Sequence, residues 1–86
     1  MLEKINEKVS VVSVFSRQKN KSVPIRIKWQ GRMYVVTKLG FHHSERLGRV
    51  LHHIFSVIAD NMFFRLNFDT EDLSWTLEEV SDGLTA

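Results

Sequence analysis

The sequence predicts an all-β fold, a small antiparallel meander or partly closed barrel of five to six strands. Two observations lead to this expectation. In residues 24–39 and 62–77, apolar residues alternate with polar ones, which is the period of a half-buried strand. Between the apolar segments lie short polar stretches that contain Gly, Asn, Asp and Ser, which are the residues that favour turns.

The composition limits the classes of protein to consider. The 86 residues are enough for one domain, 1–86, with a single modest core. The chain contains no cysteine, which excludes disulfides, thiolate metal sites and a cysteine nucleophile. The opening stretch MLEKINEKVS lacks the apolar region of a signal peptide. We therefore expect a cytoplasmic protein.

The first strand is predicted from composition alone. The stretch VSVVSVFS, residues 9–16, is rich in β-branched side chains, which favour strands. The polar, basic stretch SRQKNKS, residues 16–22, follows it as a turn or linker. Pro24 then opens the next apolar segment, and proline is tolerated at the first residue of a strand.

The hairpin in residues 24–39 has two alternative registers. A two-residue turn at Gln30-Gly31 places Ile27 opposite Tyr34 and mixes charged and apolar groups on both faces. A loop of residues 29–31 places Ile27 opposite Met33 and separates the two kinds of side chain. Because a slip of one residue exchanges the faces of a strand, we favour the register with the cleaner separation. Its apolar face comprises Ile25, Ile27, Met33, Val35 and Leu39, and its basic face comprises Arg26, Lys28, Arg32, Tyr34, Val36 and Lys38.

Residues 44–59 fit both a helix and a strand. As a helix, they and the residues up to Met62 carry apolar side chains at helical spacing, with Ser44 as the N-cap. As a strand, alternate residues from Leu51 to Ala59 share one largely apolar face. Gly48 and the Val/Ile-rich end lower the helix propensity. The residues alone leave both alternatives open.

The last hairpin closes over the polar turn DTED, residues 69–72. Alternate apolar residues precede and follow this turn, so a tight closure brings them into facing pairs. The expected pairs are Phe68 with Leu73, Leu66 with Trp75, and Phe64 with Leu77. Large facing side chains stabilise a sheet, and we expect these pairs to be the densest part of the core.

Four segments, WQGRMYVV, HIFSV, FFRLNFD and LSWTLEEVSD, resemble a small bacterial domain with a Trp-x-Gly-Arg-x-Tyr hairpin and a terminal Trp-x-Leu strand. The resemblance covers residues 24–83. Domains of this family occur as short proteins and joined to relatives of translesion DNA polymerases. The resemblance implies that residues 53–58 form a strand and carries no catalytic residues over. We therefore expect residues 44–59 to be extended; an α+β fold with a helix at 44–59 is the alternative.

All four histidines lie in the stretch HHSERLGRVLHH, residues 42–53. A hairpin that turns at Leu47-Gly48 places His43 opposite His52, and His42 opposite His53. Glu45 shares the face of the first pair, and two histidines with a carboxylate are potential ligands of a divalent cation. No recognised spacing such as His-Glu-x-x-His is present. We expect structural or surface histidines, no metal ion and no cofactor.

The charge is unevenly distributed along the chain. Residues 1–40 carry nine basic residues against two acids, a net +7, whereas residues 41–86 carry three against eight, a net −5. Cations interleaved with aromatic side chains suit a single strand of DNA or RNA, because the cations contact phosphates and the rings stack on bases. We expect binding through Arg26, Lys28, Trp29, Arg32, Tyr34 and Lys38, extended by Arg17, Lys19 and Lys21.

The alternative function is a protein-interaction or homodimerisation module. The first strand has apolar groups on both faces, which suits pairing of an exposed edge with another strand. Catalysis is not expected, because the chain has no glycine-rich phosphate loop and no serine in a nucleophile-elbow context.

Overall fold

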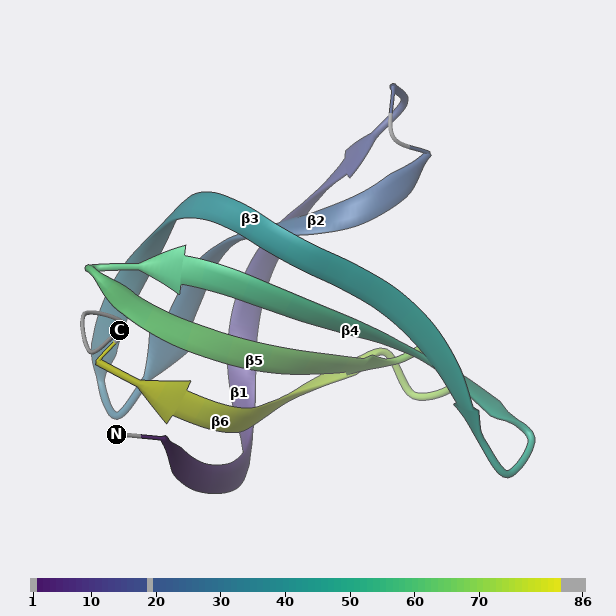
Figure 1. Ribbon diagram of the computed structural model, residues 1–86. Coiled ribbons are helices and arrows are strands. Elements are labelled where there is room, and N and C mark those ends of the chain that lie inside the picture. The colour runs from purple at the N-terminus through teal and green to yellow at the C-terminus, as the bar shows by residue number, and fades with distance from the viewer. Residues whose placement is uncertain (1, 19, 83–86) are drawn as a thin grey trace.

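The computed structural model describes residues 2–18 and 20–82, and every regular element in this part of the chain is a strand. Each strand pairs antiparallel with the next, and β6 pairs with β1, so that the sheet closes into a ring (Figure 1). The all-β prediction and the extended conformation of residues 44–59 are confirmed. The strands are β1 (Glu3–Ser16), β2 (Lys21–Trp29), β3 (Arg32–Leu47), β4 (Val50–Ala59), β5 (Met62–Asp69) and β6 (Ser74–Ser81).

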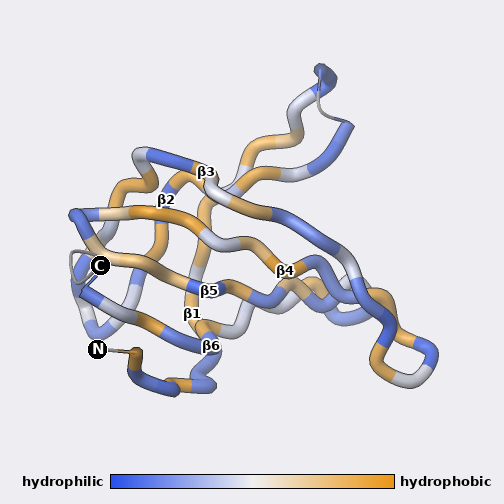
Figure 2. The backbone as a smooth tube through the Cα atoms, viewed as in Figure 1, coloured by the Kyte–Doolittle hydropathy of each residue, from blue (hydrophilic) through white to orange (hydrophobic). Residues whose placement is uncertain are grey.

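The core fills the inside of the ring. Successive side chains of a strand point to opposite faces, so alternate apolar residues of β4, β5 and β6 face inward. The tube in Figure 2 is mostly apolar along the centre of β4 and hydrophilic at the tip of the β1–β2 hairpin. Each fully buried large apolar side chain contributes about 1.5–3 kcal/mol. The buried residues of this core cluster are Ile27, Tyr34, Phe55, Val57, Ala59, Phe64, Leu66, Trp75, Leu77 and Val80.

The predicted register of the β2–β3 hairpin is wrong by one residue. Ile27 pairs with Tyr34, and the turn consists of Gln30 and Gly31 alone. Both turn residues have positive φ, 52° and 75°, as a type I′ turn requires, and this turn matches the twist of the strands. The register buries the Tyr34 ring at 6% exposure and leaves Met33 and Val35 at 48% and 53%. Burial of the larger ring and a matching turn outweigh the cleaner separation of faces.

The last hairpin also differs from its predicted register. Phe68 pairs with Trp75 and Leu66 with Leu77. The turn includes Leu73, which is exposed and has a φ of 61°. The Asp69 carboxylate accepts the backbone N–H groups of residues 71 and 72, at 2.8 and 3.2 Å. These side chain–backbone hydrogen bonds stabilise a longer turn than the predicted one.

The β3–β4 hairpin turns at Gly48-Arg49 rather than at Leu47-Gly48, because Leu47 pairs with Val50. Gly48 has a φ of 66°, which costs glycine little. His52 therefore lies opposite Glu45, and His53 opposite Ser44. The predicted facing pairs, His43 with His52 and His42 with His53, are wrong.

A two-stranded arm leaves the ring at one end. β1 pairs with β6 only as far as Val9, and β2 pairs with β3 only from Arg26 onward. In the described part of the chain, the strand ladder of residues 13–16 and 21–24 joins only these two segments, and this hairpin protrudes from the ring (Figure 1). Ile25 is an extra residue between the paired residues Pro24 and Arg26, and a bulge tolerates proline and bends a strand. We call residues 13–16 and 21–24 the β1–β2 arm.

Candidate functional site

The two aromatic residues of the predicted nucleic-acid site belong to the core. The Tyr34 ring lies 5.1 Å from that of Phe64, centroid to centroid, and Trp29 packs edge-on against Phe64 at 6.3 Å. Tyr34 is buried and Trp29 is half-buried. The prediction that Tyr34 lies on an exposed basic face is therefore wrong, since its ring is covered by protein.

Arg32 makes contacts within the protein. Its guanidinium donates to the Asp60 carboxylate at 2.6 Å and lies 5.0 Å from the centroid of the Tyr34 ring. Asp60 belongs to the turn between β4 and β5, so this ion pair joins two neighbouring turns. An exposed ion pair contributes little to stability, about 0–1 kcal/mol. The contacts nevertheless hold the guanidinium close to the buried Tyr34 side chain.

The remaining predicted cations are exposed. Arg26 and Lys28 are neighbours on the outer face of β2, whereas Lys38 lies farther along β3, opposite Ile58. Within residues 2–18 and 20–82 none of the three forms an ion pair. The structure thus brings Arg26 and Lys28 together and separates them from the aromatic rings. Of the proposed extension, Arg17 is exposed and Lys21 half-buried, and Lys19 lies outside the described residues.

Apolar side chains surround these two cations. Arg26 pairs with Val12 on one side and Val35 on the other, and Lys28 pairs with Ser10 and Met33. Val12 and Val14 are 47% and 50% exposed. Contiguous exposed apolar side chains mark interaction sites on soluble proteins. We call Val12, Val14, Met33 and Val35, together with Arg26 and Lys28, the outer patch.

One edge of the outer patch is an open strand edge. On the side away from β2, β1 has a strand partner only from Glu3 to Val9. Among the described strands, none pairs with residues 10–15 on that side. Unpaired backbone N–H and C=O groups at such an edge can pair with another strand. The sequence analysis named the first strand as an exposed edge with apolar groups on both faces, but it did not predict that this edge adjoins the exposed side chains of Arg26, Lys28, Met33 and Val35.

A groove of about 420 Å³ lies beside the outer patch, between residues 7–10 of β1 and residues 28–31. Lys8, Lys28 and Trp29 are among the residues that line it. The Trp29 Nε1 atom is buried, and no hydrogen-bond acceptor contacts it in the described part of the chain. A buried donor without a partner is rare.

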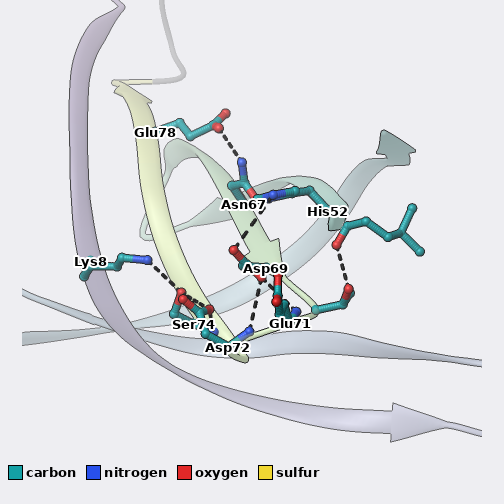
Figure 3. A network of polar contacts seen from close by, with 10 residues as sticks. Lys8, His52, Asn67, Asp69, Glu71, Asp72, Ser74 and Glu78 are labelled. Carbon is teal, nitrogen blue, oxygen red and sulfur yellow. Dashed lines mark hydrogen bonds and ion pairs between the residues drawn. The ribbon is translucent and has the colours of Figure 1, made fainter. Parts of the chain in front are cut away.

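Two of the histidines belong to polar contacts on the outer face of the ring. His52 Nδ1 donates to Asn67 Oδ1 at 2.7 Å, and the Asn67 amide donates to Glu78 at 2.8 Å (Figure 3). Arg65 Nε also donates to Glu78, at 2.9 Å. His43 Nε2 lies 3.9 Å from a Glu45 carboxylate oxygen. These partners explain the side-chain positions without a ligand.

The other two histidines form a chain with a lysine. Lys21 Nζ lies 3.3 Å from His42 Nδ1, and His42 Nε2 lies 3.1 Å from His53 Nδ1. Burial lowers the pKa of His42 below its ordinary value of 6.5, and the nearby Lys21, His53 and His43 lower it further. In residues 2–18 and 20–82 no group of three or more His, Asp or Glu side chains is placed to hold a metal ion. The absence of a metal ion in the protein stays a prediction.

The fold and these surfaces define a class of protein: a small antiparallel meander closed into a ring, with an apolar, cation-bearing outer face. No family model, curated protein or solved structure matches the chain. The resemblance to the bacterial Trp-x-Gly-Arg-x-Tyr domain therefore stays a prediction. In the described part of the chain, no helix is long and apolar enough to span a membrane.

Proposed function

We propose that this chain is a non-catalytic protein-interaction module that binds an acidic, apolar strand of a partner protein. The observation that carries the proposal is the open edge of β1 at residues 10–15, which continues directly into the outer patch. A partner strand added at this edge gains main-chain hydrogen bonds, and its alternate side chains pack on Val12 and Val14.

The charge of the outer patch favours a particular partner. Arg26 and Lys28 lie between the apolar side chains of the patch, and their cross-strand neighbours include no acid. A second copy of the chain would bring like charges together, whereas carboxylates of another protein complement them. Arginine and methionine, both present in the outer patch, are enriched at protein interfaces.

A suitable probe is an extended peptide in which every second residue is in turn valine or glutamate and the residues between them are threonine, because both kinds of side chain then lie on the face of the outer patch. Titrated into the ¹⁵N-labelled protein, it is expected to shift the amide signals of residues 10–15 first, because the new ladder forms there. Val14→Asp is expected to abolish these shifts, since it places a carboxylate against the acidic peptide. Leu47→Asp is the matched control, because Leu47 is 52% exposed and lies at the far tip of β3.

The same titration distinguishes an acidic partner strand from other possible occupants of the open β1 edge. Shifts that spare residues 10–15, or that persist in Val14→Asp, contradict strand addition at this edge. Concentration-dependent dimerisation of the wild type that Val14→Asp removes would show that a second copy occupies the edge, and the acidic partner would then be wrong. Sedimentation equilibrium without peptide measures this directly.

A second candidate function is binding of single-stranded DNA or RNA, and the observation that favours it is the groove beside the outer patch. Lys8 and Lys28 line this groove, together with Glu7 and the Trp29 side chain. Phosphate oxygens accept from the two ammonium groups, and Arg26 extends the cationic surface. Tyr34 has no part in this version of the site.

The salt dependence of oligonucleotide binding separates the two candidates. Three phosphates neutralised by Lys8, Arg26 and Lys28 give a slope of log affinity against log salt of about −2, at about −0.7 for each phosphate. Reversal of Arg26 and Lys28 to Glu is expected to abolish such binding, whereas reversal of Arg46 and Arg49, at the far hairpin, is the control. An oligonucleotide that does not bind at low salt contradicts the second candidate.

A further inference from the structure

A cavity of about 160 Å³ lies between the β1–β2 arm and the strands β4 and β5. Phe55 and Phe68 supply its apolar surface, and Lys21, Ser22, His53 and Thr70 supply its polar surface. A cavity of about 150 Å³ holds a benzene ring. The size and the two aromatic walls therefore suit a ligand with one ring.

The hydrogen-bond chain next to the cavity fixes which atoms carry protons. A lysine ammonium only donates, so the His42 Nδ1 atom accepts from Lys21 at 3.3 Å. Neutral His42 then carries its hydrogen on Nε2 and donates it to His53 Nδ1 at 3.1 Å. His53 consequently carries its own hydrogen on Nε2. Both Lys21 and His53, which line the cavity, thus have N–H donors to offer.

The charges around the cavity favour an anion. None of the described residues that line it is acidic, whereas Lys21 is a cation. The nearest carboxylate in sequence, Asp69, accepts backbone N–H groups of its own turn and lies 3.9 Å from His52 Nε2 on the outer face. The lowered pKa of His42, caused first by burial and then by Lys21, is consistent with the neutral form that the chain requires.

We propose that this cavity binds a small organic acid whose aromatic ring packs between Phe55 and Phe68 and whose carboxylate accepts hydrogen bonds from Lys21 and His53. A charge-assisted hydrogen bond is stronger than a neutral one, so the lysine contributes most of the selectivity for an anion. The β1–β2 arm brings Lys21 to the cavity. Ligand binding therefore also holds the arm against the ring.

Benzoate is the probe, used with the full chain and followed by NMR. Saturable shifts are expected at Phe55, Phe68 and Thr70. Lys21→Gln and His53→Gln are each expected to weaken binding about tenfold, because each removes one hydrogen bond to a charged group. Arg17→Gln, which removes a cation of the same hairpin outside the cavity lining, is the matched control and is expected to leave the affinity unchanged.

Two further compounds test the two halves of the ligand. Benzylamine has the same ring with a positive charge and is expected not to bind, whereas inorganic phosphate has the charge without the ring and is expected to bind far more weakly than benzoate. The proposal is overturned if benzoate produces no saturable shifts, if benzylamine binds equally well, or if phosphate matches benzoate. Unchanged benzoate affinity in both folded variants, as judged by thermal unfolding, overturns it as well.

Discussion

The position of Tyr34 distinguishes the two alternative registers of the β2–β3 hairpin, because only the observed one buries its ring. Its ring contacts Trp29 and Phe64 inside the ring of strands, and the Arg32 guanidinium lies 5.0 Å from its centroid. Its neighbours in sequence, Met33 and Val35, point to solvent. An aromatic residue between two smaller apolar ones is ambiguous in sequence, and only the packing partners from β5 resolve it.

Tyr34→Ala is expected to lower the free energy of unfolding by about 3–5 kcal/mol, because it leaves a cavity among the core rings. Met33→Ala, on the outer face of the same hairpin, is expected to change it by less than about 0.5 kcal/mol. Urea unfolding followed by tryptophan fluorescence measures both. Equal losses in the two variants would contradict the observed register.

His42 links stability to pH. Its pKa is lowered in the folded protein, first by burial and then by Lys21, His53 and His43, so the unfolded chain takes up a proton at higher pH than the folded one. The stabilisation that wild type holds relative to His42→Gln is therefore expected to be constant above the ordinary pKa of 6.5 and to fall as the pH drops below it. Urea unfolding at a series of pH values checks this. A difference independent of pH would rule the linkage out.

At the scale of the element, the turn sets the register of β2 and β3. Gln30 and Gly31 both have positive φ, and asparagine adopts this conformation more readily than glutamine. Gln30→Asn is expected to raise the free energy of unfolding by up to about 1 kcal/mol, and Gly31→Ala to lower it by about 1 kcal/mol. Thermal unfolding of the two variants gives both signs. If Gln30→Asn proves destabilising, the type I′ turn is incorrect.

The sequence allowed the strands to be predicted, but their registers were predicted less well. Alternation and β-branched residues are local signals, and they located the strands and the core residues Phe64, Leu66 and Leu77. The registers depend on positive φ at Gln30, Gly48 and Leu73, and two of these residues are not glycine. The turn at Gln30-Gly31 was one of two alternatives in the sequence, and the choice between them depends on the burial of Tyr34, which occurs only in the folded protein.

The candidate site was predicted only in part for a similar reason. The basic character of residues 1–40 is visible in the sequence, and Arg26 and Lys28 are exposed as expected. The outer patch combines side chains from β1, β2 and β3, so its composition depends on three registers at once. The one-residue error in the β2–β3 register placed Tyr34 on the outer face and Met33 and Val35 in the core, whereas the structure has the reverse.

At the scale of the whole molecule, the strands of the ring and those of the arm differ in how many hydrogen-bonded neighbours they have. Strands β4 and β5 have hydrogen-bonded neighbours on both sides, whereas each strand of the arm has a single neighbour. Amide hydrogens of residues 13–16 and 21–23 are therefore expected to exchange at least about tenfold faster than those of residues 54–57 and 64–66. Hydrogen exchange followed by NMR gives the comparison. Equal protection of arm and ring in a monomeric sample would contradict it.

Glu3 of β1 pairs with Val80 of β6, so the first and last strands are neighbours in the ring. A chain that began at a different turn would therefore have the same order of strands around the ring. A short linker from the end of β6 to the start of β1, together with a new opening at Gly48-Arg49, would leave the ladders of the ring unchanged. Circularly permuted proteins of this kind tolerate new termini at exposed turns. The adjacency of β1 and β6 would likewise allow the ring of strands to be inserted into a surface loop of a host protein without stretching that loop. Because its first and last strands are adjacent, this fold is suited to insertion as a domain within another protein.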